Sequence, residues 1–209
     1  MLNFCSRFHE EEAVSNVRDF PIFRVAEEVY GWGLKLQEKI RMPDTSSRPL
    51  HPKVGIGHVH LKVADLERAL AFYRDVLGFQ VTQRHGQEAA FLSAGGYHHH
   101  IGLNTWESSG GSPPPPDAPG LYHLAILYPT RQELAHALRR LIRVKIPLEG
   151  ASDHGVSEAL YLRDPDGNGV ELYWDRPEEE WPRSPEGSLA MFTRPLDLNR
   201  LLGEADFTK

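Results

Sequence analysis

The sequence predicts an α+β protein with two βαβββ modules, whose mixed sheets close around one cleft. The order of a strand, a helix and three strands occurs twice between Gly55 and Trp181. A segment rich in Gly, Ser and Pro separates the two copies. Two like modules joined by a linker indicate an internal duplication.

The composition limits the classes of function open to the chain. Its 209 residues include 23 Lys and Arg against 29 Asp and Glu, a net charge of −6, and 40% of them are hydrophobic. A chain of this size buries a sizeable core, and its acidic balance argues against nucleic acid or an anionic membrane as a partner. No stretch approaches the roughly 20 apolar residues of a membrane-spanning helix. Cys5 is the only cysteine, so no disulfide bond and no Cys-based zinc site forms within one chain, and a cytoplasmic location is expected.

The predicted divisions of the chain follow changes in composition. Residues 1–50 form an N-terminal extension with at most two short helices, because Pro21, Gly31 and Gly33 interrupt its apolar positions. Residues 1–41 are interpreted as an appendage or the product of a wrongly chosen start codon, which the N-terminal peptide mass of the natively expressed protein tests. The remaining parts are a first module at 51–107, a linker at 108–120, a second module at 121–181 and a tail with a short helix at 182–209.

The first module begins with an alternating strand at Ile56–Val63. Asp65 is expected to cap the helix that follows, whose apolar residues share one face and which ends at Gly78. Three further strands are expected at Phe79–Arg84, Glu88–Ser93 and His98–Asn104, because glycine-containing turns separate these apolar runs.

The second module repeats this order. Its first strand is expected at Leu121–Tyr128, and Thr130 is expected to cap a helix from Arg131 to Arg143. Three more strands are expected between Pro147 and Trp174. The short helix of the tail is predicted from four leucines, Leu196, Leu198, Leu201 and Leu202.

Strand alternation places two histidines and one carboxylate on the sheet faces that the helices leave uncovered. His58 and His60 share one face of their strand, His123 takes the place of His58 in the second module, and Glu171 lies between two apolar residues of the last strand. If the two half-sheets share one concave surface, His58, His123 and Glu171 converge there. Two imidazoles and one carboxylate with open coordination positions are the ligand set of non-haem Fe(II) oxygenases, so the cleft is predicted to bind a metal.

Two segments carry a resemblance to a known family. Residues 65–79, DLERALAFYRDVLGF, resemble the first helix of the vicinal-oxygen-chelate superfamily, which includes glyoxalase I, bleomycin and fosfomycin resistance proteins and extradiol ring-cleavage dioxygenases. Residues 154–171, HGVSEALYLRDPDGNGVE, resemble the extradiol dioxygenase signature, in which a His, an apolar residue with Tyr, Asp-Pro-x-Gly and Glu follow one another. Ser152 departs from it, since the signature usually has Gly or a small apolar residue two positions before the His. The resemblance covers residues 56–176.

The resemblance implies a role for each matching residue. His58, His123 and Glu171 would bind Fe(II), with Mn(II) as an alternative that these ligand types allow. His154 and Tyr161 would line the pocket of a catechol-like substrate and hydrogen-bond its oxygens, with His154 as the base.

Three adjacent histidines precede the end of the first module. His99-His-Ile-Gly-Leu103 resembles the family's stretch whose histidine is an acid–base group beside dioxygen, so His99 is assigned that role. His98 and His100 are expected on the opposite strand face from His99. Their role, and that of His60, stays open.

Several functions are compatible with this reading. The first is an Fe(II)-dependent extradiol dioxygenase of aromatic catabolism, acting with O2 on a catechol-type diol and forming a homodimer. The second is a glyoxalase-like lyase or thiol transferase, although such relatives usually add a fourth ligand, often Glu, where this chain offers only its three adjacent histidines, His100 being the candidate. The third is a non-catalytic binding protein of the resistance type, which has no need for His154, Tyr161 and three metal ligands together.

Asp164 and Asp166 belong to a tight turn and receive no catalytic role. Glu178–Glu180 is interpreted as a solvated run of charged residues.

Overall fold

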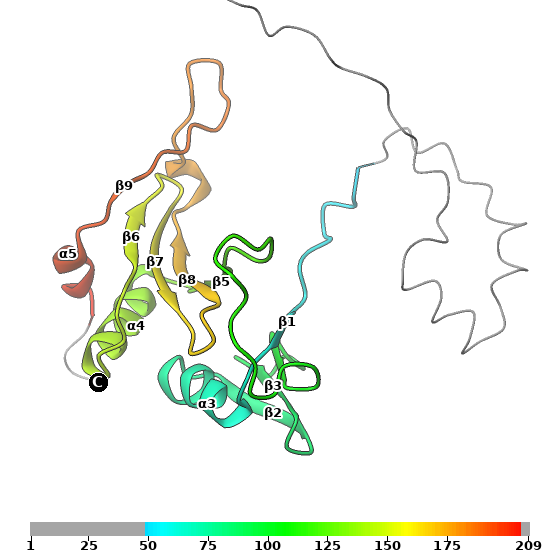
Figure 1. Cartoon of the computed structure of the whole chain (residues 1–209). Coiled ribbons are helices and arrows are strands. Elements are labelled where there is room, and N and C mark those ends of the chain that lie inside the picture. Colours follow the sequence, from blue (N-terminus) through cyan, green and yellow to red (C-terminus); the bar gives the residue numbers. More distant parts are fainter. Residues whose placement is uncertain (1–48, 206–209) are drawn as a thin grey trace, which may run out of the picture. The chain divides into compact units, whose positions relative to one another are not determined.

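The computed structural model describes residues 49–205 (Figure 1). The expected helices before residue 49 and the placement of residues 206–209 therefore lie outside the described residues. The chain divides into two units, Met1–Val54 and Gly55–Lys209, and every element below belongs to the second. No helix among the described residues is long enough and apolar enough to cross a membrane.

The first module contains a four-stranded sheet in the order β1-β4-β3-β2. β1 pairs in parallel with β4, and the other pairs are antiparallel, so the sheet is mixed. Its strands are β1 (Val59–Lys62), β2 (Gln80–His85), β3 (Ala89–Ser93) and β4 (Ile101–Asn104).

The second module contains a five-stranded sheet in the order β5-β8-β7-β6-β9. β5 pairs in parallel with β8, as β1 does with β4, and the remaining pairs are antiparallel. Its strands are β5 (Leu124–Leu127), β6 (Gly150–Asp153), β7 (Ser157–Arg163), β8 (Gly169–Asp175) and β9 (Arg194–Pro195). The predicted α+β class with two mixed sheets is confirmed, and among the described residues the sheets stay separate without closing into a barrel.

The helix of the first module changes its winding halfway. α3 (Leu66–Leu70) is capped as predicted by Asp65, whose carboxylate accepts from Arg68 N. The chain continues as a π-helix, η2 (Ala71–Val76), in which Leu77 N donates to Phe72 O at 2.9 Å, five residues back.

The remaining helices lie in the second module and the tail. α4 (Arg131–Arg143) has the predicted bounds, and Thr130 caps it by accepting from Glu133 N at 3.2 Å. The acidic run is a short 3-10 helix, η3 (Glu178–Glu180), and all of its residues are exposed as predicted. The tail contains α5 (Leu198–Leu202), where Leu201 is fully buried, so the packing helix expected there is confirmed.

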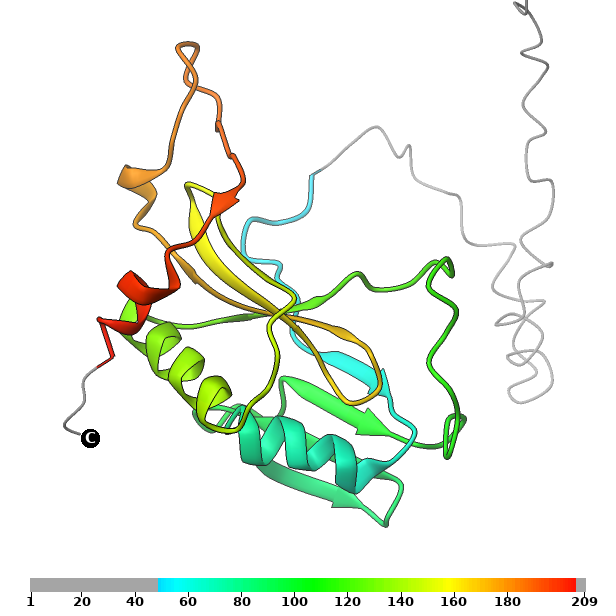
Figure 2. The same cartoon turned by 60° about the vertical axis from the view of Figure 1, so that its left-hand side comes forward.

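The helices of the two modules lie beside each other (Figure 2). Arg140 of α4 donates through Nη1 to the carbonyl of Leu77 at 2.9 Å and to that of Val76 at 3.3 Å. It thereby supplies a hydrogen-bond donor for carbonyl groups at the end of η2, which lack partners within the helix. Gly78 follows with φ +92°, and a Cβ there would lie 2.5 Å from Arg140 Nη1. Glycine is required at this helix end both for the backbone conformation and for the approach of Arg140.

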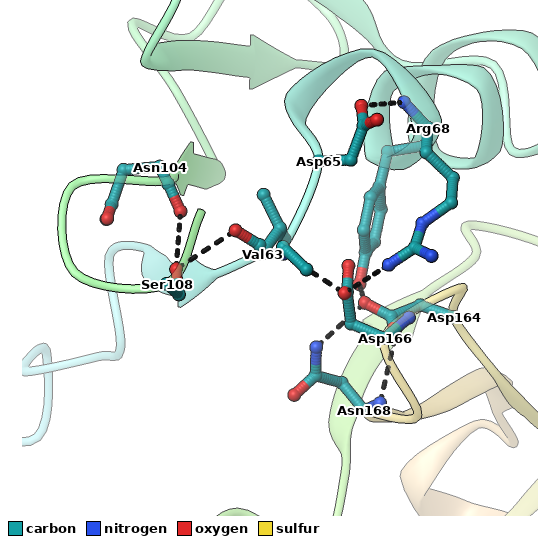
Figure 3. A network of polar contacts seen from close by, with 10 residues as sticks. Val63, Asp65, Arg68, Asn104, Ser108, Asp164, Asp166 and Asn168 are labelled. Atoms are coloured by element: carbon teal, nitrogen blue, oxygen red, sulfur yellow. Dashed lines mark hydrogen bonds and ion pairs between the residues drawn. The ribbon is translucent and has the colours of Figure 1, made fainter. Parts of the chain in front are cut away.

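The turn between β7 and β8 binds the first module through two buried aspartates (Figure 3). Asp164 accepts from Tyr73 Oη and Asn168 Nδ2, each at 2.9 Å. Asp166 accepts from Ala64 N at 3.0 Å and pairs with Arg68 at 2.6 Å. The Asp-Pro-Asp-Gly turn therefore links the two modules through hydrogen bonds and an ion pair.

We predict that Tyr73→Phe lowers the free energy of unfolding by about 1.5–3 kcal/mol, because it removes a hydrogen bond to a buried charged group. Burial and the neighbouring Asp164 raise the pKa of Tyr73, so its hydroxyl stays protonated and donates throughout the usual pH range. Urea denaturation of the purified variant measures the change. Tyr122→Phe, at a tyrosine that is 82% exposed, serves as the control and should leave unfolding unchanged. A urea midpoint of Tyr73→Phe equal to that of the wild type would contradict the hydrogen bond from Tyr73 to Asp164.

Candidate active site

The predicted alternation along β1 and β8 is confirmed. In β1 the side chain of Leu61 is buried, whereas its neighbours His60 and Lys62 are exposed. In β8 the side chains of Val170 and Leu172 are buried. Glu171 lies between them and points to the opposite, uncovered face of the sheet.

His123 and Glu171 form a contact on the uncovered face of the second sheet. His123 immediately precedes β5, where Ala125 is in register with Glu171 on β8. His123 Nε2 lies 2.8 Å from Glu171 Oε2. His123 Nδ1 is buried and has no hydrogen-bond partner among the described residues, so within this part of the chain the contact with Glu171 fixes the orientation of the ring.

Tyr161 extends this contact across the sheet. It lies directly opposite Glu171 in the β7–β8 register, and its hydroxyl is 3.2 Å from Glu171 Oε1 and 2.7 Å from His154 Nε2. Burial, followed by the nearby Glu171 carboxylate, raises the pKa of Tyr161 to about 12. The hydroxyl is therefore protonated at neutral pH and available as a hydrogen-bond donor. His123, Glu171, Tyr161 and His154 form a continuous polar row.

His58 lies on the other module, in contact with His99. Their ring centroids are 4.5 Å apart, and His99 also packs edge-on against Phe91 of β3 at 5.0 Å. Burial lowers the pKa of His99, and the neighbouring histidines, His58 first, lower it further. Its imidazole is thereby biased towards the neutral form, which both accepts and donates a hydrogen bond.

The expected alternation of the three adjacent histidines is wrong. β4 begins only at Ile101, so His98, His99 and His100 precede the regular strand. The Nδ1 atoms of His98 and His99 are 2.8 Å apart, so these rings are not on opposite faces. His100 lines the same cavity as His58, which His99 contacts.

Two cavities meet at His123. A cavity of about 700 Å³ is bounded by both modules and has His58, His100 and His123 in its wall. A second cavity, of about 440 Å³, is lined by His123 together with His154 and Tyr161. Across residues 49–205, no three His, Cys, Asp or Glu side chains are close enough together to hold a metal ion. The structure thus brings His123 and Glu171 together and places His58 on another wall of the larger cavity.

Two donor atoms, His123 Nε2 and Glu171 Oε2, suit a divalent metal. A 2.8 Å approach between His123 Nε2 and Glu171 Oε2 is stable in two ways: Nε2–H donates to the carboxylate, or both atoms direct lone pairs at one cation. An imidazole nitrogen and a carboxylate oxygen are ligands that both Fe(II) and Mn(II) accept. The two atoms therefore suit a shared metal ion.

Sequence reasoning missed three neighbours of the predicted residues. Phe192 and Thr193 contact His154 through a carbonyl and a hydroxyl, at 3.1 and 3.2 Å from Nδ1. They lie in the tail, and no local pattern connects them with His154. Trp106 packs near His60, whose pKa is lowered by burial and by His58.

Comparison with known proteins identifies related sequences. The profile of the glyoxalase/bleomycin resistance protein/dioxygenase superfamily matches residues 55–172. Catechol-2,3-dioxygenase of Bacillus subtilis (strain 168) is 46% identical over 157 residues, which cover 75% of this chain and 54% of that protein. The chain therefore spans about half the length of this relative.

Two more distant relatives have a metal in their names. Iron-dependent extradiol dioxygenase of Rhodococcus jostii (strain RHA1) is 30% identical over 56% of this chain and 42% of its own length. Manganese-dependent 2,3-dihydroxybiphenyl 1,2-dioxygenase of Geobacillus genomosp. 3 is 28% identical over 63% of this chain and 39% of its own length. Among solved structures, a glyoxalase/dioxygenase from Nostoc punctiforme is similar in fold, with a TM-score of 0.50, 21% identity, and coverage of 63% of this chain and 99% of that one.

Proposed function

The chain belongs to the glyoxalase/bleomycin resistance protein/dioxygenase superfamily, and within it we propose that the protein is an Fe(II)-dependent extradiol dioxygenase. Its substrate would be a catechol-type diol, opened with O2 at the carbon–carbon bond beside the two hydroxyls. Both oxygen atoms enter the product, so no further reductant is required. The observation that carries the proposal is the polar row from His123 through Glu171 and Tyr161 to His154.

We propose that His58, His123 and Glu171 hold the metal. The contact between His123 Nε2 and Glu171 Oε2 supports two of these ligands, and the shared cavity supports His58. When bound, Fe(II) supplies open coordination positions and redox chemistry that bring the diol and O2 to one centre. Mn(II) is the alternative, since relatives are named for either metal.

His154 and Tyr161 act on the diol in this proposal. Tyr161 keeps its proton at neutral pH and donates a hydrogen bond to a substrate oxygen, which orients the ring. His154 Nε2, which is 2.7 Å from the hydroxyl of Tyr161, accepts the proton that the diol releases. His99, biased towards the neutral form, hydrogen-bonds O2 from the opposite module and exchanges a proton there.

The proposal is tested on protein purified without air. Its metal content is measured first, and visible absorbance is then recorded after addition of Fe(II), catechol and air. A yellow ring-cleavage product is expected. Bound iron with no product from a panel of catechols would overturn the dioxygenase proposal, and the lack of any bound metal would overturn the metal site as well.

We predict that His154→Ala retains the metal but loses turnover. A positioned acid–base group contributes about 10²- to 10⁴-fold to a rate, so kcat should fall within that range while the iron content stays at the wild-type value. Metal analysis and initial rates on one preparation measure both. His136→Ala, at a histidine on α4, is the control. Unchanged turnover in His154→Ala would remove the role of base.

A glyoxalase-like lyase is the second candidate, because His100 lines the same cavity as His58 and His123 and offers a fourth donor. Turnover of the hemithioacetal of methylglyoxal and glutathione would favour it. A dioxygenase should cleave catechol and leave that compound unchanged. Binding of small molecules without turnover of either would favour a resistance-type binding protein.

We propose further that the protein is a cytoplasmic homodimer. Among the described residues, β1 and β5 are edge strands that pair with a neighbour on one side only, and exposed edges invite pairing with another chain. Ile56 and Leu121, beside these edges, are 97% and 68% exposed. Sedimentation velocity at micromolar concentration distinguishes a dimer from a monomer.

A further inference from the structure

The tail returns to the second sheet and lies against His154. β9 pairs antiparallel with β6, with Asp153 opposite Arg194 and Ser152 opposite Pro195. One step further along this ladder, Phe192 N donates to the carbonyl of His154 at 3.2 Å. The tail therefore forms an additional strand at the point where β6 ends.

The same segment contacts the imidazole of His154. Nδ1 lies 3.1 Å from the carbonyl oxygen of Phe192 and 3.2 Å from the hydroxyl of Thr193. A carbonyl oxygen only accepts hydrogen bonds, so this contact requires the proton on Nδ1. In the neutral ring Nε2 then carries a lone pair. It accepts the single hydroxyl proton of Tyr161 at 2.7 Å, in place of the longer 3.2 Å contact of that hydroxyl with Glu171 Oε1.

Packing holds the tail in this place. Gly155 has φ +79°, and a Cβ there would lie 2.6 Å from the ring of Phe192 and 2.8 Å from that of Pro182. Leu201 and Ala205, further along the tail, are buried in the core. The approach of Phe192 to His154 thus depends on the lack of a side chain at Gly155.

We propose that Phe192 and Thr193 are positioning residues, which hold His154 in the tautomer with Nδ1 protonated and so present Nε2 as the proton acceptor beside Tyr161. The effect of this positioning on catalysis rests on the dioxygenase function proposed above. The tail would then determine on which nitrogen the base acts, whereas the hydroxyl of Tyr161, which both donates and accepts, is compatible with either tautomer.

The tautomer is measured directly, without substrate or metal. Long-range ¹H–¹⁵N correlation spectra of the ¹⁵N-labelled full chain distinguish Nδ1–H from Nε2–H, and His154→Gln assigns the signals. The wild type is expected to show Nδ1–H. Gly155→Val, which displaces Phe192, should raise the population with Nε2–H. A wild-type ring protonated on Nε2 overturns the proposal.

The kinetic test uses variants of Thr193. Thr193→Val keeps the shape of the side chain and removes the hydroxyl, so kcat should fall about five- to tenfold at unchanged KM, the effect of one lost hydrogen bond. Thr193→Ser should restore kcat, and Thr105→Val, in the first module, should have wild-type values. Wild-type kcat in Thr193→Val overturns the role of Thr193. If the wild type itself cleaves no diol, the proposed dioxygenase function is wrong. The NMR measurement of the His154 tautomer still tests whether Phe192 and Thr193 position this ring.

Discussion

Glu171→Ala is expected to remove the metal and to lower ring cleavage more than about a thousand-fold, because a bound metal contributes several kcal/mol to such a reaction. Glu171 contacts His123 Nε2 through one oxygen and Tyr161 through the other. Its loss therefore removes one proposed ligand, leaves the His123 ring without a hydrogen-bond partner among the described residues, and leaves His154 as the partner of the Tyr161 hydroxyl. Metal content of anaerobically purified protein and the initial rate of product formation measure the two effects.

The isosteric variant Glu171→Gln separates charge from shape. It preserves the volume and hydrogen-bonding reach of the side chain but lacks the negative charge that holds a divalent cation, so it should lose metal as well. Glu107→Ala, at an exposed carboxylate of the first module, is the matched control with wild-type iron. Full iron occupancy and wild-type rates in Glu171→Ala would exclude Glu171 as a ligand.

The second large effect is expected on stability. Glu158, on β7, is only 4% exposed and binds Arg131 of α4 at 2.7 Å and Arg176, just after β8, at 2.9 Å. Removal of one partner from a buried ion pair costs about 3–5 kcal/mol. Arg131 and Arg176 keep Glu204 and Asp153 as second partners, so the lower end of this range is expected. Glu158→Ala should therefore lower the free energy of unfolding by that amount, measured by urea denaturation at neutral pH.

The matched control is an ion pair of the same length at the surface. Arg84 Nη1 lies 2.7 Å from Glu67 Oε1, and both side chains are exposed. An exposed pair contributes about 0–1 kcal/mol, so Glu67→Ala should unfold almost as the wild type does. Equal effects of Glu158→Ala and Glu67→Ala would show that burial does not decide the contribution of Glu158.

Local signals predicted most of the fold. The bounds of α4 and its cap at Thr130 agree with the structure because helix spacing and capping are properties of neighbouring residues. The strand expected at Leu121–Tyr128 is shorter, Leu124–Leu127, because β8 pairs with only this part. The π-helical turn after Leu70 was not predicted, since the same apolar face is compatible with either winding.

The candidate site was predictable only as far as single strands determine it. Alternation placed Glu171 and His60 on the correct faces, since it depends on residue parity alone. The histidines before Ile101 were misplaced because the strand begins later than their apolar neighbours indicate. The contact of Thr193 with His154 joins residues far apart in the chain. The periodicity of apolar residues within a strand or helix does not predict such a contact.

Side chains, and not the connecting segment, hold the two modules in register. Asp164 and Asp166 reach from the β7–β8 turn to Tyr73 and Arg68, whereas residues 111–120 of the linker are exposed throughout. A chain opened within this linker would keep those contacts. We therefore expect the association of the two modules to survive cleavage within this exposed linker.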